Sequence, residues 1–147
     1  MDRRIDVEAT VNASLDDVWR LWTTTEGMKS FLVEEADIKL EPGGFYEVFF
    51  DMEAVEGSRG SEGCRILSYL PQEMISFSWN APPTIPELRK LGPCTWVVVR
   101  FEAVSDKQTR VKITHLGILE GADWDRYLEY FTKAWPFVLE ACQKHFG

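Results

Sequence analysis

The sequence is poor in the residues that bind metals or form disulfides. Its 147 residues include three cysteines and two histidines, and Cys64, Cys94 and Cys142 lie far apart without a C-x-x-C pair. Metal sites need several Cys or His ligands at characteristic spacings, so a multi-histidine or Cys/His metal centre is excluded. No cofactor motif is present either, because Gly43-Gly44 is not followed by the Gly-Lys-Ser/Thr of a phosphate loop. An odd number of scattered thiols fits a reducing compartment, and we expect a cytoplasmic protein.

Long apolar runs and an excess of positive charge are also missing. No window approaches 18 uncharged apolar residues, and residues 1–6 (MDRRID) lack the apolar core of a signal peptide. We therefore expect neither a membrane span nor export. The 16 Lys and Arg residues are outnumbered by 24 Asp and Glu, which gives a net charge of −8. Nucleic acids and anionic membranes both attract clustered Lys and Arg, so this charge balance argues against either partner.

Large aromatic side chains, in contrast, are abundant. The chain contains six Trp, nine Phe and four Tyr, 19 in all. A domain of this length buries roughly 68–70% of the surface of its unfolded chain and needs no disulfide or metal to fold. We therefore expect residues 1–147 to form a single domain in which these rings either fill the core or line a binding site.

The hydrophobic pattern predicts one strand, two short helices, a run of strands and a long helix. Apolar and polar residues alternate from Ile5 to Val11, as in a strand with one buried face. Ser14 is a good N-cap for a helix that follows at once, and a second helical turn is expected over 25–32. Period-two segments separated by Gly, Pro and Asp turns then predict strands at 33–40, 45–52, 60–70, 73–80, 94–104 and 109–118.

Two later segments do not follow this pattern of strands and tight turns. Residues 81–93 contain four prolines and form a 13-residue connection, a length that is uncommon in compact domains and is often a functional lid. Residues 124–146 carry apolar side chains at every third or fourth position, which predicts a long amphipathic helix with a kink at Pro136. The order indicates an α+β fold, in which the long helix covers part of the apolar face of an antiparallel sheet. The remaining part of that face is either filled by the short helices or left as a cavity.

Six short stretches also share their order and spacing with a known group of proteins. They are 43–46 (GGFY), 62–67 (EGCRIL), 77–79 (FSW), 109–111 (TRV), 115–117 (HLG) and 134–139 (AWPFVL). Together they resemble the START-related helix-grip superfamily (SRPBCC, Bet v 1-like), and within it the branch named after the activator of the 90-kDa heat-shock protein ATPase. The resemblance implies about seven antiparallel strands curled around the C-terminal helix, with an elongated cavity between them. Members hold sterols, lipids, polyketides or other apolar molecules in that cavity, and a minority catalyse cyclisation or hydrolysis there.

Aromatic residues on two predicted surfaces are the candidates for such a cavity wall. Strand parity places Phe77, Trp79 and Phe101 on inward faces. Helical spacing places Phe131 and Trp135 on the stripe opposite. Facing rings either interlock as core or leave a slot for a flat ligand, and the sequence leaves both open. The full candidate set for ligand binding is Phe77, Trp79, Val99, Phe101, Ile113, His115, Tyr127, Phe131, Trp135 and Leu139.

His115 and Glu47 are the candidates for acid–base chemistry. Strand parity groups His115 with Val111 and Ile113 on an inward face. Three roles are open for it: a buried neutral histidine bonded to a backbone or hydroxyl oxygen, a group that orients a ligand, and a catalytic acid or base. Glu47 has Phe45 and Phe49 on its own face of a predicted strand, and that parity is the reason to consider an inward carboxylate.

Three functions follow from these observations. The leading hypothesis is an intracellular binder of a hydrophobic, ring-containing small molecule or lipid between the sheet and the long helix. The second is a cyclase- or hydrolase-like enzyme that uses His115, with Glu47, in the same cavity. The third is a co-chaperone-like interaction module, which the resemblance implies. It is the least favoured, because the family's namesake carries an additional N-terminal domain for which 147 residues leave no room. A homodimer is left open, since the sequence holds no signal for one.

Overall fold

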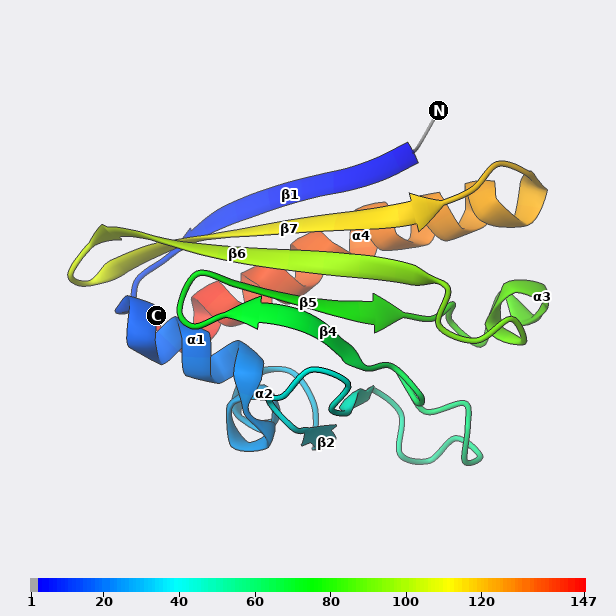
Figure 1. Ribbon diagram of the computed structural model, residues 1–147, viewed down its shortest axis with the longest axis horizontal. Coiled ribbons are helices and arrows are strands. Elements are labelled where there is room, and N and C mark those ends of the chain that lie inside the picture. The colour runs from blue at the N-terminus through cyan, green and yellow to red at the C-terminus, as the bar shows by residue number, and fades with distance from the viewer. Residues whose placement is uncertain (1–2) are drawn as a thin grey trace.

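A curved antiparallel sheet and one long helix dominate the fold (Figure 1). The computed structural model describes residues 3–147 and has the predicted α+β element order, with one short helix added. The strands are β1 (Arg3–Val11), β2 (Glu35–Ile38), β3 (Tyr46–Phe49), β4 (Ile66–Leu70), β5 (Met74–Trp79), β6 (Thr95–Ser105) and β7 (Gln108–Ile118). The helices are α1 (Leu15–Thr23), α2 (Thr25–Phe31), α3 (Pro86–Arg89) and α4 (Ala122–His145).

The seven strands form two sheets rather than one continuous ladder. Five strands pair antiparallel in the order β1-β7-β6-β5-β4, and β2 and β3 form a separate pair. Isolated bridges from Phe45 to Arg65 and from Phe49 to Gly60 connect β3 to the segment before β4. The strand predicted over 60–70 therefore begins only at Ile66, because Gly63 has a positive φ of 85° and turns the chain out of the ladder.

The two short helices begin at the residues that the sequence provides as caps. The side chain of Ser14 accepts a hydrogen bond from the backbone N–H of Asp17, and Thr24 does the same for Gly27. α1 packs against β6 and β7, where Trp19 meets Phe101 edge-on. These helices therefore cover the end of the sheet that α4 alone does not fill.

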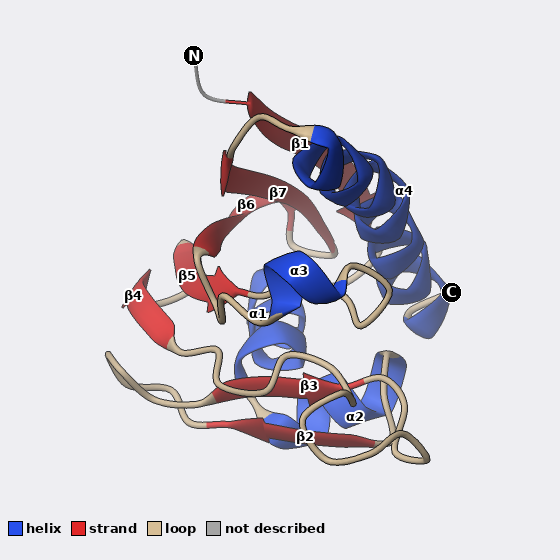
Figure 2. Cartoon of the chain, turned by 90° about the vertical axis from the view of Figure 1, so that its right-hand side faces the viewer, coloured by secondary structure: helices blue, strands red, loops and turns tan. Residues whose placement is uncertain are grey.

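The long helix α4 lies along the inner face of the sheet (Figures 1 and 2). It runs as one helix through Pro136, which is exposed, so the missing backbone donor lies on the solvent side. Its backbone approaches β1 and β7, and Gln143 Nε2 donates to the carbonyl of Thr10 at 3.0 Å. The buried stripe predicted from helical spacing is confirmed, and α4 points it at the sheet. None of the helices within residues 3–147 has both the length and the apolar character needed to cross a membrane.

The proline-rich segment 81–93, called the strap from here on, closes the end of the molecule at which α4 begins (Figure 2). It contains α3, a single helical turn that the sequence did not predict, with Pro86 at its first position. Ile85 and Leu88 are buried and join the hydrophobic core. The strap is therefore a packed element of the fold and not a free loop.

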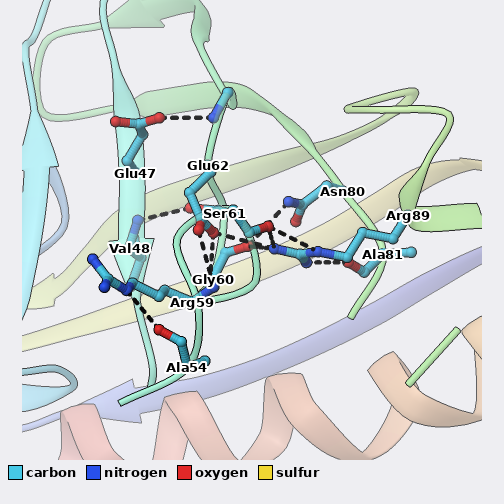
Figure 3. Close-up of polar contacts among 12 residues, drawn as sticks. Glu47, Val48, Ala54, Arg59, Gly60, Ser61, Glu62, Asn80, Ala81 and Arg89 are labelled. Carbon is cyan, nitrogen blue, oxygen red and sulfur yellow. Dashed lines mark hydrogen bonds and ion pairs between the residues drawn. The ribbon is translucent and has the colours of Figure 1, made fainter. Parts of the chain in front are cut away.

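Arg89 fastens the strap to the neighbouring loop (Figure 3). Its guanidinium donates to the carbonyls of Ala81 at 2.6 Å, Gly57 at 2.7 Å and Gly60 at 2.9 Å. It also forms an ion pair with Glu62 at 3.1 Å. Burial of the Glu62 carboxylate opposes its ionisation, but the N–H groups of Arg59 and Gly60 and the charge of Arg89 outweigh that effect and lower its pKa. A planar group with five donors suits this set of acceptors, which a lysine would not satisfy.

We predict that Arg89→Ala loosens the strap without unfolding the sheet. The substitution leaves carbonyls of a partly buried loop without donors, which costs about 1–3 kcal/mol. Amide hydrogen exchange measured by mass spectrometry should become faster in peptides from 81–93. The control is Lys90→Ala, whose exposed side chain pairs with Glu87 on the surface. Equal exchange in the two variants would show that Arg89 does not hold the strap.

Candidate functional site

His115 lies at the centre of the space between the sheet and α4. On β7 it is paired in register with Val97 of β6 and Ile5 of β1, and it has no solvent exposure. Val111 and Ile113, which share its face of the strand, are also fully buried. The inward orientation predicted from strand parity is therefore confirmed.

Both ring nitrogens of His115 are hydrogen-bonded inside the protein. Trp135 Nε1 lies 3.0 Å from Nδ1, and because an indole N–H can only donate, we assign the His115 proton to Nε2. Nε2 lies 2.9 Å from Thr95 Oγ1 and 3.1 Å from Tyr127 Oη, and these two hydroxyl oxygens are 2.7 Å apart. Thr95 donates in turn to the carbonyl of Trp79 at 3.2 Å. The network therefore runs without a gap from α4 through β7 and β6 to β5.

The imidazole of His115 is neutral in this environment. Burial lowers its pKa to about 3, because the desolvated interior disfavours the charged form of the ring. Protonation of Nδ1 would also set that nitrogen against the Trp135 N–H, donor to donor. This is the arrangement of the first role considered for His115, a buried neutral histidine bonded to a hydroxyl oxygen.

Glu47 does not join His115, and the inward orientation considered for it is wrong. Tyr46 and Val48 supply the buried face of β3, so Glu47 lies on the opposite face with Phe45 and Phe49. Its carboxylate accepts a hydrogen bond from the Gly63 N–H at 2.7 Å (Figure 3). The stretch FYEVF is apolar in both strand phases, which made the parity ambiguous. The structure therefore provides no His115–Glu47 pair for acid–base catalysis.

The predicted wall residues do come together. All ten lie between the sheet and α4 or on the adjoining core, and each is at most 6% exposed. Ring centroids of Trp79 and Trp135 are 5.5 Å apart, those of Tyr127 and Phe131 are 4.7 Å apart, and those of His115 and Phe131 are 5.0 Å apart. Of the two arrangements left open by the sequence, the structure has the interlocked one.

Three polar participants in this region were not among the predicted site residues. Thr95 shares the inward parity of Val97 and Val99 on β6, so strand alternation alone identifies it. The hydroxyl of Tyr46 donates a hydrogen bond to the carbonyl of Trp22 at 2.7 Å. Trp22 Nε1 is buried and has no hydrogen-bond partner among residues 3–147, although it faces the Cys142 thiol. No pattern in the sequence points to that unpaired donor.

Open hollows lie elsewhere on the molecule. One of about 530 Å³ is lined by residues 29–34 of α2 and the turn after it, and by residues 49–53 at the end of β3 and just beyond it. Another of about 440 Å³ lies between the start of α1 and the turn that joins β6 to β7. Neither of these two reaches the space between the sheet and α4. Within residues 3–147, no three His, Cys, Asp or Glu side chains are grouped to hold a metal ion.

The Trp135–His115 hydrogen bond should contribute measurably to the free energy of unfolding. We predict that Trp135→Phe lowers the free energy of unfolding by about 1–3 kcal/mol more than Trp22→Phe, as measured by urea denaturation. Both substitutions shrink a buried indole to a phenyl ring, but only the first leaves a bonded acceptor, His115 Nδ1, unpaired. Equal losses in the two variants would mean that the network contributes nothing.

The depressed pKa of His115 also predicts a pH dependence. Between pH 6.5 and 3 the unfolded chain binds a proton at this histidine that the folded chain does not bind. The folded state therefore loses stability as pH falls through this window, and the full contribution is present above it. His115→Gln should show a shallower loss between about pH 6.5 and 4.5 in denaturation curves measured across that range. Asp6, whose pKa the hydrogen bond from Arg4 lowers to about 2, affects stability only at lower pH.

A family model and several solved structures match the chain. The model described as "Activator of Hsp90 ATPase homolog 1-like protein" matches residues 12–147. Protein MLL2253 from Mesorhizobium loti superposes with a TM-score of 0.75 at 18% identity, covering 97% of this chain and 96% of its own. The Aha1 dimer from Colwellia psychrerythraea gives a TM-score of 0.72 at 16% identity, covering 98% and 96%. No curated protein sequence matches the chain.

A third structure is CalU16 from Micromonospora echinospora, with a TM-score of 0.70 at 18% identity, covering 99% of this chain and 77% of its own. Identities this low show a common fold and nothing finer. The family assignment has a separate basis, since its model spans nearly the whole sequence. The chain belongs to the family of Activator of Hsp90 ATPase homolog 1-like proteins.

Proposed function

We propose that the protein binds a hydrophobic, ring-containing small molecule between its sheet and α4. Its main support is the cluster of large rings from β5 and α4, in which the ring of Trp135 packs against that of Trp79 with tilted planes. The backbone of α4 approaches β1 and β7, whereas Trp79 of β5 is reached by the ring of Trp135. The helix-grip fold, whose members commonly hold apolar ligands at this place, supports the same location.

An interior packed by contacts between aromatic rings can replace some of those contacts with contacts to a bound ligand. An aromatic pair contributes about 0.5–1.5 kcal/mol beyond the burial of its surface. A flat apolar molecule that separates Trp79 from Trp135 offers each ring an equivalent face, so little ring–ring attraction is lost. The ligand itself gains about 25 cal/mol for every Å² of apolar surface that leaves water. Uptake is then driven by the burial of the ligand's own surface.

The strap is the proposed route of access. It is anchored by Ile85, Leu88 and Arg89, all within a few residues, and α3 is a single turn. A helix this short has no stability of its own, so its position depends on those anchors. Displacing the strap uncovers the end of the interior at which Tyr127 lies. α4 and the five-stranded sheet then have to part only locally, where the guest enters between Trp79 and Trp135.

The two other functions have less support. Acid–base catalysis lacks a partner for His115, because Glu47 lies on the outer face of β3. The co-chaperone function rests on the description of the family and on no contact in this structure.

We predict that the neutral dye N-phenyl-1-naphthylamine binds in this interior. In a ¹H–¹⁵N spectrum, the indole N–H signals of Trp79 and Trp135 should shift on titration, assigned through Trp→Phe variants. The signal of Trp96, which is 41% exposed on the outer face of the sheet, is the internal control and should stay in place. Unchanged Trp79 and Trp135 signals at saturating dye would overturn the proposal.

A further inference from the structure

The interior of this protein holds no formal charge. The chain has 40 charged side chains, yet within residues 3–147 no Asp, Glu, Lys or Arg is buried. The buried polar side chains are Ser, Thr, Asn and His only. The nearest approach to a buried ion pair, Arg89–Glu62, lies in the strap and its loop, where each charge compensates the other. An acidic protein of net charge −8 therefore surrounds an uncharged centre.

The titratable groups in the interior are also neutral at physiological pH. They come from β3 (Tyr46), the segment before β4 (Cys64), β7 (His115) and α4 (Tyr127 and Cys142). Burial raises the pKa of both tyrosines, raises that of Cys64 to about 12 and that of Cys142 to about 11, and lowers that of His115 to about 3. Each group is driven toward its uncharged form by the same desolvation. None of them can serve as a counter-ion for a ligand.

The groups that touch His115 leave no place for a charge either. Its ring faces Trp135, Tyr127 and Phe131 from α4, and Thr95 from β6. The polar atoms among them already bond to one another. A carboxylate placed here would lose its water and gain no cation and no free cluster of donors, and such a transfer is strongly unfavourable. An uncharged ring system of the same shape gives up far less hydration, because a neutral ketone or ether is hydrated much more weakly than a carboxylate.

We propose that the interior selects neutral ligands, binding an uncharged aromatic or alicyclic molecule and rejecting the same skeleton when it carries a carboxylate or sulfonate. This inference rests on the proposed function and names the class of ligand. It excludes ionised fatty acids and aromatic acids as ligands, and it leaves neutral ketones, ethers, alcohols and hydrocarbons. The selection follows from the absence of a counter-charge and not from the shape of the interior.

The test compares two competitors of nearly equal shape. N-phenyl-1-naphthylamine is bound to the full chain, and its fluorescence is followed while 2-acetylnaphthalene or 2-naphthoate is added at neutral pH. The ketone should displace the dye, and the carboxylate should require a concentration at least about 100-fold higher. On acidification toward the pKa of naphthoic acid, the acid should gain potency while the ketone does not change. The pKa of His115, at about 3, lies below that range.

The outcomes separate the two proposals. If the dye does not bind at all, the proposed function fails. If the dye binds and both competitors displace it equally, ligand binding stands and selection for neutral ligands is overturned. A second arm of the test uses a variant that adds a positive charge. Leu139→Lys places a cation on the buried face of α4 and should narrow the difference between the ketone and the carboxylate in the concentration needed to displace the dye. Leu139→Met adds no charge and should not narrow that difference. The comparison on the unaltered chain is decisive even if the lysine variant does not fold.

Discussion

The hydrogen bond from Trp135 to His115 determines how α4 sits on the sheet. A buried indole N–H and a buried imidazole nitrogen each carry a desolvation penalty unless they are paired. Turning α4 by one residue, about 100°, would leave both unpaired and would point a polar face at the sheet. The apolar stripe alone tolerates several neighbouring rotations, because hydrophobic contact has no direction. This directional contact, together with the hydrogen bonds of Tyr127 to Thr95 and His115, therefore selects which rings meet Trp79, and with them the composition of the proposed binding space.

The same hydrogen-bond network keeps the interior uncharged. His115 is satisfied as a neutral ring by one donor, Trp135, and by the hydroxyl oxygens of Thr95 and Tyr127, which donate in turn to the carbonyls of Trp79 and Asn80. Introducing a positive charge would require an acceptor in place of the indole. Because every member is neutral and bonded, the low dielectric of the core imposes little penalty on the network itself. Under the proposed function, that penalty would fall on a charged guest.

The sequence predicted those parts of the fold in which the hydrophobic pattern allows only one assignment of the buried face. The alternation in β7 and the spacing in α4 place His115 and Trp135 on facing surfaces without any knowledge of their partners. Prediction failed where two phases are equally apolar, as around Glu47, and where a glycine such as Gly63 breaks the ladder. The sequence also did not predict α3. The four prolines of this segment are typical of a loop, and its single helical turn depends on hydrogen bonds from Arg89 to acceptors that are distant in the sequence. Interlocking of the rings is a matter of packing distance, which no one-dimensional pattern contains.

Stability and access depend on different contacts in this molecule. The network holds α4 to β7, β6 and β5, and it reaches the strap only at its base, through the carbonyls of Trp79 and Asn80. Beyond residue 80 the strap depends on Ile85, Leu88 and Arg89, and the hydrogen bonds of Arg89 go to Ala81, Gly57, Gly60 and Glu62 rather than to the network. A closed resting state lowers the apparent affinity of a ligand by the fraction of molecules that are open. In the proposed mode of access the strap moves first, so that fraction is governed mainly by the contacts of Ile85, Leu88 and Arg89.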